Sequence, residues 1–355
     1  MTASDAMAER IWINRMSNLV WRIARLYGRV RTGTIGTACL GACLCLCLAL
    51  APMPLFAEPS RLICVLVPHF KDEYWLSVAY GLEQEAARQN ADLLMYEAGG
   101  YAAQARQIEQ LAACANRGVD AILIGAVTQD DPALRDAIAA SAHDVPIFGL
   151  VNDVDSDALQ GRIGVDWHDM GLVIGRHLAM LHPEGSAKQS ALLVSGPSRS
   201  GWPALLEAGL RDGLAESSVK IIDRFGADTG LRQQLSIVET ALKQHPEADY
   251  LIGSAPAIEA AMGLRARPGD RTSPTLISTY ISHTVLRGLI NGAVMAASFD
   301  DPALQGELAI RRIVEGAGAN PGPGPLGPEV VLMSRSAQDF TQIRVSPANY
   351  FPDIQ

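Results

Sequence analysis

The 355-residue chain predicts an α/β protein made of two doubly wound parallel-sheet lobes with a cleft between them. Short apolar runs alternate with amphipathic helical stretches from Arg61 onward, and strands apolar on both faces are typical of parallel sheets covered by helices. The alternation stops near residue 160 and then begins again. Because 48% of the residues are hydrophobic, the chain can bury a core in each lobe.

The first lobe is predicted over residues 60–160 by four buried strands separated by helices. The strands are "LICVLV", "ADLLMYEA", "DAILIGA" and "VPIFGLV". The spacing of apolar residues predicts helices from about Tyr74 to Gln89, over "QARQIEQLAACANRG" and over "PALRDAIAASA". We expect the segment of about residues 294–335 to return and complete this lobe.

The second lobe is predicted over residues 161–293 by the same pattern. A helix from Asp166 to His182 precedes the strands "SALLVSG", "VKIIDRFG", "DYLIGS" and "PTLISTY", with helices between them. After Gly316, the stretch "GAGANPGPGPLGPE" is too rich in Gly and Pro to be helical, and "VVLM" is predicted as a last edge strand. Residues 336–355 are predicted to form a C-terminal tail.

Residues 1–57 are typical of a secretory signal peptide. Arg22, Arg25, Arg29 and Arg31 precede an apolar stretch that ends at Ala57. An uncleaved membrane anchor is the alternative, because this stretch is nearly long enough to span a bilayer. We expect cleavage and export to the periplasm.

The mature chain is expected to be acidic. The full chain carries a net charge of −9, and residues 1–57 contain six Arg and two acidic residues. Their removal leaves 23 basic and 36 acidic side chains, a net charge of −13. Nucleic acid is therefore not an expected partner, because its binding needs a basic surface.

No sequence pattern predicts catalysis, a cofactor or a metal site. The first strand is not followed by a Walker loop or a G-x-G-x-x-G motif, and the seven His residues lack metal-ligand spacing. Cys64 and Cys114 are the two cysteines beyond residue 57. We expect them either to form a disulfide or to stay as two buried thiols.

Aromatic residues gather at the turns that follow the predicted strands, although they make up only 6% of the chain. Open parallel sheets bind ligands outside the carboxyl ends of their strands, so these turns line the cleft. Trp75 and Trp167 stand one in each lobe, and together they indicate a ligand clamp; taken singly, each would be a packing residue. Tyr74 is expected to line the cleft beside Trp75 only if the chain there is not yet regular helix.

Aromatic faces that converge on one point favour a methylated ammonium group, whose diffuse positive charge is attracted by the ring quadrupoles. Asp72 adds a carboxylate that favours a cation, and its alternative role is a helix N-cap. Arg199 also has two open interpretations, a donor to an anionic or oxide group and a partner in a surface ion pair.

An exported chain with two successive doubly wound lobes resembles the type I periplasmic binding proteins of the ribose-binding class, over roughly residues 60–315. Several stretches resemble one branch of that class, the TorT family. These stretches are "VPHFKDEYWLSVAYGLEQEA", "EAGGY", "IGVDWHDMG", "YLIGSAPAIEAA" and "STYISHTVLRGLI". The combinations D-x-Y-W, G-V-D-W and S-x-Y-[IL]-S-H carry the resemblance across both lobes.

The resemblance implies a binding protein and not an enzyme. TorT proteins bind trimethylamine N-oxide (TMAO) between their lobes and associate with the periplasmic sensor domain of the histidine kinase TorS. Asp72 would reach the oxide of this ligand through a water, and Tyr101 in the "AGGY" turn is a further candidate. The aromatic residues implied by the matching motifs are Trp75, Tyr74, Trp167 and Tyr280.

Two alternatives stay open, one for the ligand and one for the function, and a third is disfavoured by the leader. A related methylated amine or N-oxide is the alternative ligand, and the receptor of an ABC importer for a sugar or methylated amine is the alternative function. Sugar-reading groups are sparse, since Tyr280 stands where ribose-binding relatives carry an aspartate. A LacI-type repressor shares the lobes, but a basic and apolar leader stands in place of its helix-turn-helix.

Overall fold

The structure, a computed structural model, describes residues 60–265, 274–316, 324–334, 340 and 343–355. The predicted signal peptide over residues 1–57 lies outside these ranges. Within them, no helix combines the length and the apolar character needed to cross a membrane.

The first sheet is entirely parallel, with the strand order β2-β1-β3-β4-β5. Alternate residues of β1 face opposite sides of the sheet. Cys64 and Leu66 pack with Leu111 of α4 (Gln104–Asn116) and Ile138 of α5 (Pro132–Ser141), whereas Ile63 packs on the other face. Both faces of the sheet are therefore covered, as the apolar strands predicted. The strands are β1 (Arg61–Val67), β2 (Ala91–Glu97), β3 (Ala121–Ile124), β4 (Ile147–Leu150) and β5 (Gly161–Ile163).

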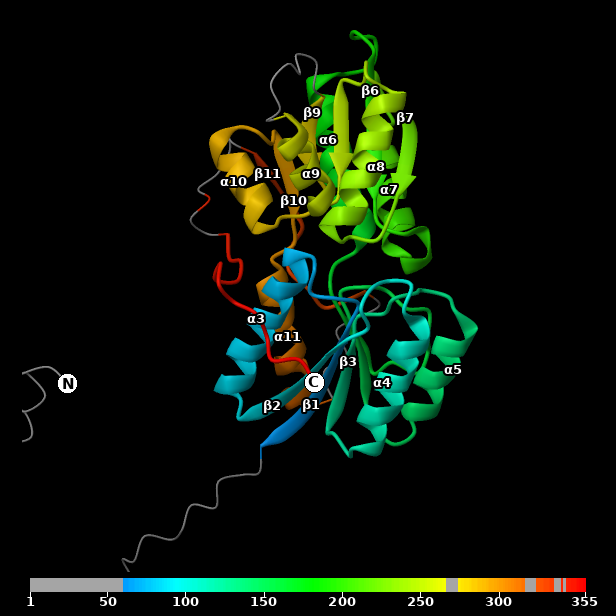
Figure 1. Ribbon diagram of the computed structural model, residues 1–355, viewed down its shortest axis with the longest axis vertical. Coiled ribbons are helices and arrows are strands. Elements are labelled where there is room, and N and C mark those ends of the chain that lie inside the picture. The colour runs from blue at the N-terminus through cyan, green and yellow to red at the C-terminus, as the bar shows by residue number, and fades with distance from the viewer. Residues whose placement is uncertain (1–59, 266–273, 317–323, 335–339, 341–342) are drawn as a thin grey trace, which may run out of the picture. The chain divides into compact units, whose positions relative to one another are not determined.

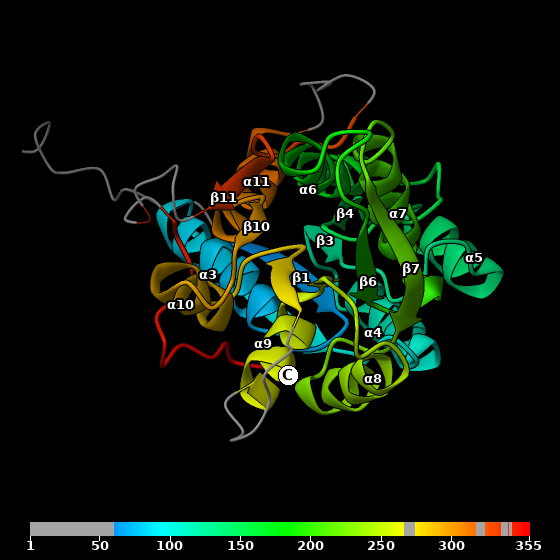
Figure 2. The ribbon, with the colours of Figure 1, turned by 90° about the horizontal axis from the view of Figure 1, so that it is seen from above.

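The second sheet has the order β11-β10-β9-β8-β6-β7, and all of its pairs are parallel except β10 with β11. The prediction of "VVLM" as an edge strand is confirmed, because β11 lies beside β10 at the end of the sheet (Figure 2). The strands are β6 (Gln189–Ser195), β7 (Val219–Gly226), β8 (Tyr250–Gly253), β9 (Thr275–Ser278), β10 (Ala296–Phe299) and β11 (Val331–Ser334).

The helices begin where side chains can cap them. Asp72, Asp131, Asp166 and Ser282 each accept a hydrogen bond from a backbone N–H in the first turn of the helix that follows. These caps fix where the helices start and therefore which residues face the carboxyl ends of the strands. The helices are α3 (Glu73–Arg88), α4 (Gln104–Asn116), α5 (Pro132–Ser141), α6 (Trp167–Leu181), α7 (Trp202–Gly213), α8 (Leu231–Gln244), α9 (Ala255–Arg265), α10 (His283–Asn291) and α11 (Pro302–Glu315).

The two doubly wound parallel sheets confirm the predicted fold class, and residues 60–355 form one compact unit that contains both sheets. We call the first sheet with α3, α4, α5 and α11 the first lobe. The second sheet with α6 to α10 is the second lobe (Figure 1).

The predicted return of residues 294–335 to the first lobe is corrected by the strand pairing. Strands β10 and β11 lie in this range but extend the second sheet. Two parts of the range do return to the first lobe: α11 runs beside α3 (Figure 1), and Leu326 forms a parallel bridge with Ile163 of the first sheet. A Cβ at Gly81 of α3 would lie 1.9 Å from the carbonyl oxygen of Ala303, so the two helices approach too closely there for any larger residue.

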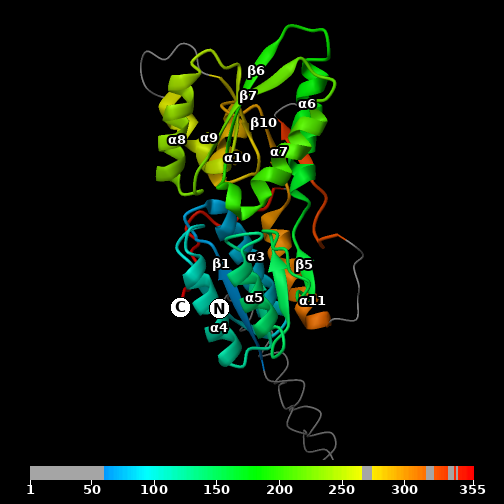
Figure 3. The same cartoon turned by 90° about the vertical axis from the view of Figure 1, so that its right-hand side faces the viewer.

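The predicted start of the second lobe at residue 161 is also corrected. Strand β5 pairs with β4 at the edge of the first sheet and lies beside α11 (Figure 3). Its sequence, Gly161-Arg162-Ile163, lacks the apolar run that marks the other strands, so the pattern did not reveal it. The chain crosses to the second lobe between Ile163 and Trp167.

Residues 343–355, the described part of the predicted tail, pack on the first lobe. Ile354 forms a parallel bridge with Met95, and the Gln355 N–H donates to the Met95 carbonyl oxygen at 2.9 Å. The Tyr350 ring meets that of Tyr80 edge to face, with centroids 5.3 Å apart.

Cys64 and Cys114 form a disulfide, which decides between the two states left open by the sequence. The bond joins β1 to α4 across the core, with the Cα atoms 6.1 Å apart and both residues at most 1% exposed. The separation of 50 residues makes the bond a substantial constraint on the unfolded chain.

We predict that the Cys64→Ala, Cys114→Ala double variant loses about 4 kcal/mol of unfolding free energy, the value expected for closing a loop of this length. Urea denaturation of the mature protein measures this. Cys64→Ala alone is expected to lose nearly as much, because either change breaks the same bond. Two reactive thiols in the unreduced, denatured wild type would contradict the prediction.

Candidate ligand-binding site

Five aromatic side chains from both lobes meet at the carboxyl ends of the two sheets. Tyr74 and Trp75 follow β1, Trp167 follows β5, Trp202 follows β6 and Tyr280 follows β9. Each is at most 4% exposed, and all three tryptophans beyond residue 57 are among them. We call these five residues the aromatic cage. Their meeting follows from topology, because the strand ends of both sheets present their turns to the same place.

The rings of the aromatic cage contact one another directly. The centroids of Trp167 and Trp202 lie 4.9 Å apart, and those of Tyr74 and Tyr280 lie 5.2 Å apart at an interplanar angle of 71°. The remaining contacts run at 6.2–6.5 Å. Such pairs gain about 0.5–1.5 kcal/mol each beyond area burial. Because the rings touch, a ligand enters among them only when the rings move apart.

The sequence predicted that Tyr74 could lie beside Trp75 at the site only where the chain is not yet regular helix. The structure places both residues in the aromatic cage and inside regular helix, so this condition was wrong. Helix α3 begins at Glu73, and both rings lie in its first turn, 6.2 Å apart at 83°. The physical reason is that helical side chains lean toward the N-terminus. Because the N-terminus of α3 points toward the site, these two neighbouring side chains both project beyond the first turn of the helix.

Two tryptophans lie against glycines at the ends of strands. A Cβ at Gly125, after β3, would lie 2.4 Å from Cη2 of Trp75. A Cβ at Gly196, after β6, would lie 2.2 Å from Cζ2 of Trp202. Each lobe therefore leaves room for one indole by omitting one side chain.

Two buried carboxylates accept hydrogen bonds from the tyrosines of the cage. The Tyr280 hydroxyl donates to Oδ2 of Asp72 at 2.6 Å, and the Tyr74 hydroxyl donates to Oδ2 of Asp300 at 2.6 Å. Gln305 Nε2 donates to the Tyr74 oxygen at 3.1 Å. Asp72 also accepts from the Tyr74 N–H at 3.1 Å, so its alternative role as a helix N-cap is confirmed and coexists with its place at the site.

Burial dominates the titration of these groups. It raises the pKa of Asp72, although the hydrogen bond from Tyr280 partly offsets the effect. It raises the pKa of Asp300 to about 6, against the opposing hydrogen bonds from Tyr74 and Gln305. Burial, together with the neighbouring carboxylates, holds the pKa values of Tyr74 and Tyr280 well above the usual value, so both hydroxyls stay protonated donors.

Sequence reasoning missed Trp202 and Asp300. Trp202 opens α7 directly after the turn Ser198–Gly201, but only the first residues of that turn were considered as candidates. Asp300 directly follows β10, whose small residues were not recognised as a strand. The signal that finds both is the rule already used for Trp75, namely position just beyond the carboxyl end of a parallel strand.

Tyr101 lies at the edge of the cage, among polar groups. Its hydroxyl accepts from Asn152 Nδ2 at 3.2 Å, and its backbone N–H donates to Asp228 of the second lobe at 3.0 Å. Its ring meets that of His69 edge to face at 5.7 Å. Burial raises the pKa of Tyr101, and Asn152 and Trp75 partly offset this. Tyr101 is thus a neighbour of Trp75 at the edge of the cage.

The three indole N–H groups have different surroundings. Trp167 Nε1 donates to the Val151 carbonyl oxygen at 3.2 Å, and Trp75 lies against the Tyr101 hydroxyl. Trp202 Nε1 is buried and has no acceptor among the described residues. A buried donor without an acceptor costs free energy, so Trp202 is the cage donor best suited to a ligand oxygen.

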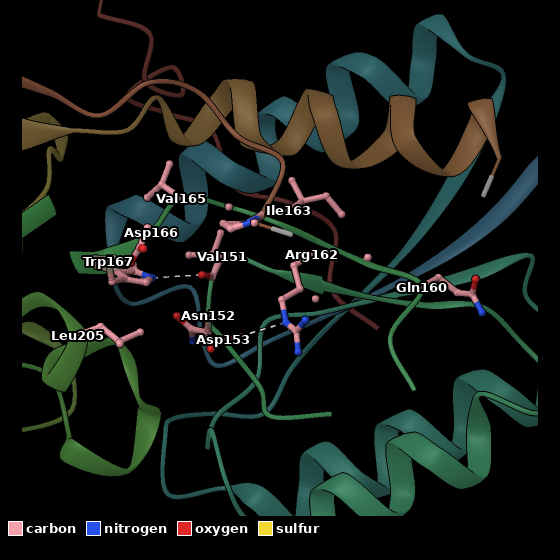
Figure 4. A pocket seen from close by; sticks show the side chains of 15 residues that line it. Val151, Asn152, Asp153, Gln160, Arg162, Ile163, Val165, Asp166, Trp167 and Leu205 are labelled. Carbon is pink, nitrogen blue, oxygen red and sulfur yellow. Dashed lines mark hydrogen bonds and ion pairs between the residues drawn. The ribbon is translucent and has the colours of Figure 1, made fainter. Parts of the chain in front are cut away.

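A cavity of about 400 Å³ lies beside the cage at the first crossing between the lobes (Figure 4). Trp167 is the single cage ring on its wall, and Arg162 pairs with Asp153 across it at 3.2 Å. Val151 also lines it and holds φ at 63°, a strained value for a β-branched residue. This cavity contains the strained crossing between the lobes and is reached by one cage ring, so we place the candidate ligand site at the cage, where five rings meet.

Polar contacts between the lobes surround the cage. His69 Nε2 donates to Asp228 at 2.8 Å, since its Nδ1 accepts from the Lys71 N–H at 3.2 Å. Arg199 pairs with Asp131 of the first lobe at 3.3 Å and is 69% exposed. Of its two interpretations, the structure therefore supports the surface ion pair. In the part of the chain that the structure describes, no cluster of His, Cys, Asp or Glu has the arrangement of a metal site.

The family of the chain follows from comparison with known proteins. The model of the periplasmic binding protein domain matches residues 63–317. The chain belongs to the periplasmic binding protein family, as a TorT-like member. The members of this family are periplasmic and in general bind solutes without enzymatic activity, which confirms the predicted localisation.

Three relatives illustrate the match. The periplasmic protein TorT of Escherichia coli (strain K12) is 34% identical over 301 residues, covering 84% of this chain and 86% of that protein. A TorS sensor domain–TorT complex solved in the presence of TMAO contains a chain that is 34% identical, with a TM-score of 0.73, covering 83% of this chain and all of the other. An ABC transporter solute-binding protein from Bradyrhizobium sp. BTAi1 with bound bis-tris is 30% identical, with a TM-score of 0.70. The match covers 84% of this chain and 90% of that protein.

We predict that the ion pair between Glu73 and His283, which joins the lobes beside the cage, weakens as the pH rises. His283 Nδ1 lies 3.6 Å from Glu73 Oε2, and this carboxylate raises the pKa of His283. Burial opposes the ionisation of Glu73, but His283 and the Thr284 N–H outweigh it and lower the pKa of Glu73. The stabilisation is therefore complete below about pH 6.5 while Glu73 is ionised, and is lost as the pH rises through the raised pKa of His283.

A titration of the His283 ring followed by NMR measures this. Its midpoint is expected to fall in Glu73→Gln and to stay unchanged in Glu83→Gln, a control change on the same helix. An equal midpoint in wild type and Glu73→Gln would show that the pair has no electrostatic effect.

Proposed function

We propose that the chain is a periplasmic receptor that binds TMAO between its lobes and signals through a TorS-like membrane histidine kinase. The observation that carries the proposal is the aromatic cage itself, in which five rings from both lobes converge with two carboxylates behind them. On this reading the protein is a binding protein without catalytic activity.

The chemistry of the cage suits a methylated ammonium. The ring faces attract diffuse positive charge, and each cation–π contact contributes about 2 kcal/mol when it is desolvated. Asp72 and Asp300 add negative charge close to the rings. TMAO presents three methyl groups on a positive nitrogen and one acceptor oxygen, which the free indole N–H of Trp202 suits.

A sugar is a poorer guest for the same residues. Sugars need amide and carboxylate groups free to bind their hydroxyls. Asp72 and Asp300 already accept from tyrosine hydroxyls, and Asn152 donates to Tyr101 and to the Ala126 carbonyl oxygen. The positions that read hydroxyls in a sugar site are thus occupied by internal hydrogen bonds.

The kinase partner is supported by the relatives. A TorT chain that is 34% identical to this chain forms a complex with the TorS sensor domain in a solved structure, and the match covers all of that relative. The contacts between the lobes supply a mechanism, because a ligand that holds the rings together stabilises one arrangement of the lobes. A partner that binds that arrangement better is then favoured by the ligand, and the reverse holds equally.

We predict that TMAO binds the mature protein together with the purified TorS-like sensor domain, and that Trp75→Ala and Trp167→Ala each raise the Kd about 30-fold. The factor corresponds to about 2 kcal/mol, the loss of one desolvated cation–π wall. Titration calorimetry measures the affinity. The three mature tryptophans all lie in the cage, so intrinsic fluorescence gives a second readout.

Tyr80→Phe serves as the control, because Tyr80 also lies on α3 but contacts Tyr350 away from the cage. Its affinity for TMAO is expected to match that of wild type. Absence of TMAO binding by the wild type in the presence of the sensor domain would refute the proposed function. Unchanged affinity in either tryptophan variant would refute the cage as its site.

We further predict that Trp202→Phe weakens TMAO binding about tenfold, while binding of tetramethylammonium changes far less. The change removes the indole N–H but keeps an aromatic ring, and one hydrogen bond to a ligand with a charged oxygen contributes about 1.5 kcal/mol. Tetramethylammonium has no acceptor oxygen and serves as the matched ligand. Equal losses for the two ligands would show that Trp202 acts through its ring alone.

A receptor for an ABC importer is the second candidate function. The similarity to the Bradyrhizobium solute-binding protein with bound bis-tris, at 30% identity, favours it specifically. Titration with bis-tris, betaine, trimethylamine and ribose beside TMAO separates the two functions. Tighter binding of ribose or bis-tris than of TMAO, without an effect of the sensor domain, would favour import.

A further inference from the structure

We propose that Asp300, acting through the hydroxyl of Tyr74, makes the aromatic cage selective for a ligand with a positive nitrogen. Asp300 is then a positioning residue, since it touches the cage ring and not the ligand. The inference rests on the proposed function, because it explains selectivity at the same site.

Asp300 is a buried carboxyl group that forms no ion pair within the part of the chain that the structure describes. The residue is 0% exposed and sits where the chain passes from β10 to α11. Oδ2 accepts from Tyr74 at 2.6 Å and from Gln305 Nε2 at 2.8 Å, while Oδ1 is buried without a partner among the described residues. A buried carboxylate left unpaired is costly, so its presence at the cage calls for a compensating positive group.

A positive ligand nitrogen among the rings is that group. A hydrogen bond from a phenol to a carboxylate polarises the phenol, which makes the ring face more negative. The Tyr74 ring lies 5.2 Å from Tyr280 and 6.5 Å from Trp167, so this change acts at the centre of the cage. Both the ring and the carboxylate behind it attract a cation strongly where water is excluded. A neutral molecule of the same shape gains from neither.

The neighbours of Asp300 do not supply a competing cation. Tyr74 faces it from α3, Gln305 from α11, and Asp301 from the N-cap position before α11. The charge of Asp301 is balanced by Arg344 of the C-terminal segment at 3.2 Å. Asp72, the other carboxylate that acts on Tyr74, is itself bonded to Tyr280.

Because Asp300 is buried, the affinity of the cage for a ligand with a positive nitrogen is expected to depend on pH. Burial raises the pKa of Asp300 to about 6, so the group is ionised near neutral pH and gains a proton just below it. A ligand with a positive nitrogen favours the ionised form. Affinity is therefore expected to fall as the pH drops through about 6.

Asp300→Asn tests the proposal, because it keeps the size of the side chain and an acceptor for Tyr74 but removes the charge. Two ligands are compared by calorimetry at neutral pH: TMAO and tert-butanol, a neutral molecule with the same three methyl groups. We expect the Kd for TMAO to rise about tenfold and that for tert-butanol to change by less than about twofold. Glu83→Gln is the control, since Glu83 lies on α3 with Tyr74 but interacts with Tyr350 away from the cage, and it is expected to bind TMAO as wild type does.

A pH series and a melting curve separate this role from a merely structural one. The TMAO affinity of the wild type is expected to fall below pH 6, whereas that of Asp300→Asn stays flat. In the folded state Asp300 keeps its proton up to about pH 6, whereas in the unfolded state it loses the proton near the ordinary pKa of an aspartate. The free energy of unfolding therefore falls as the pH rises between these two values. The free Asp300→Asn protein is therefore expected to melt at or above the wild-type temperature at neutral pH.

Two results would overturn the proposal. One is an unchanged TMAO affinity in Asp300→Asn while wild type binds TMAO. The other is a parallel loss of TMAO affinity, tert-butanol affinity and melting temperature, which would make Asp300 a structural residue. A wild type that binds no TMAO overturns the proposed function, and this inference with it.

Discussion

The contact between aromatic rings of the two lobes is the interaction on which the rest of the site depends. Tyr74 and Trp75 reach it from the first lobe, and Trp167, Trp202 and Tyr280 reach it from the second lobe or the crossing into it. Their mutual burial draws the strand ends of both sheets together. Outer polar contacts, such as that of His69 with Asp228, join the lobes around the rings.

Both crossings between the lobes contain a residue with a strained backbone. Val151 has a strained backbone, and its carbonyl oxygen accepts the hydrogen bond of the Trp167 indole. Asp301 lies where the chain returns from β10 of the second lobe to α11 of the first, and it is also in the left-handed region, with φ at 39°. Strained residues persist only where the surroundings fix them, and here a cage ring is part of those surroundings. The cage and the first crossing are thus joined directly, through the hydrogen bond from Trp167 to Val151.

The hydrogen bonds of the two tyrosines run in opposite directions across the cage. Tyr280 of the second lobe donates to Asp72 of the first lobe, and Tyr74 of the first lobe donates to Asp300 at the end of β10. Each lobe therefore provides one ring and one carboxylate to the other. This reciprocal arrangement brings two negative groups into a buried space, which is costly for the protein alone and favourable once a positive group is bound.

The sequence by itself determined the fold class, most strands and helices, and the turns that carry Asp72, Trp75, Trp167 and Tyr280, because period and strand position are local properties of the chain. It made no prediction of α10 or α11. It did not reveal β5, β10 or the mixed destination of residues 294–335, since short strands of small or polar residues carry no apolar signal. Only the tertiary structure decided that Trp202 joins the rings, that Asp300 lies behind Tyr74 and that Cys64 meets Cys114. Those pairings depend on where distant segments pack, and no local pattern specifies that.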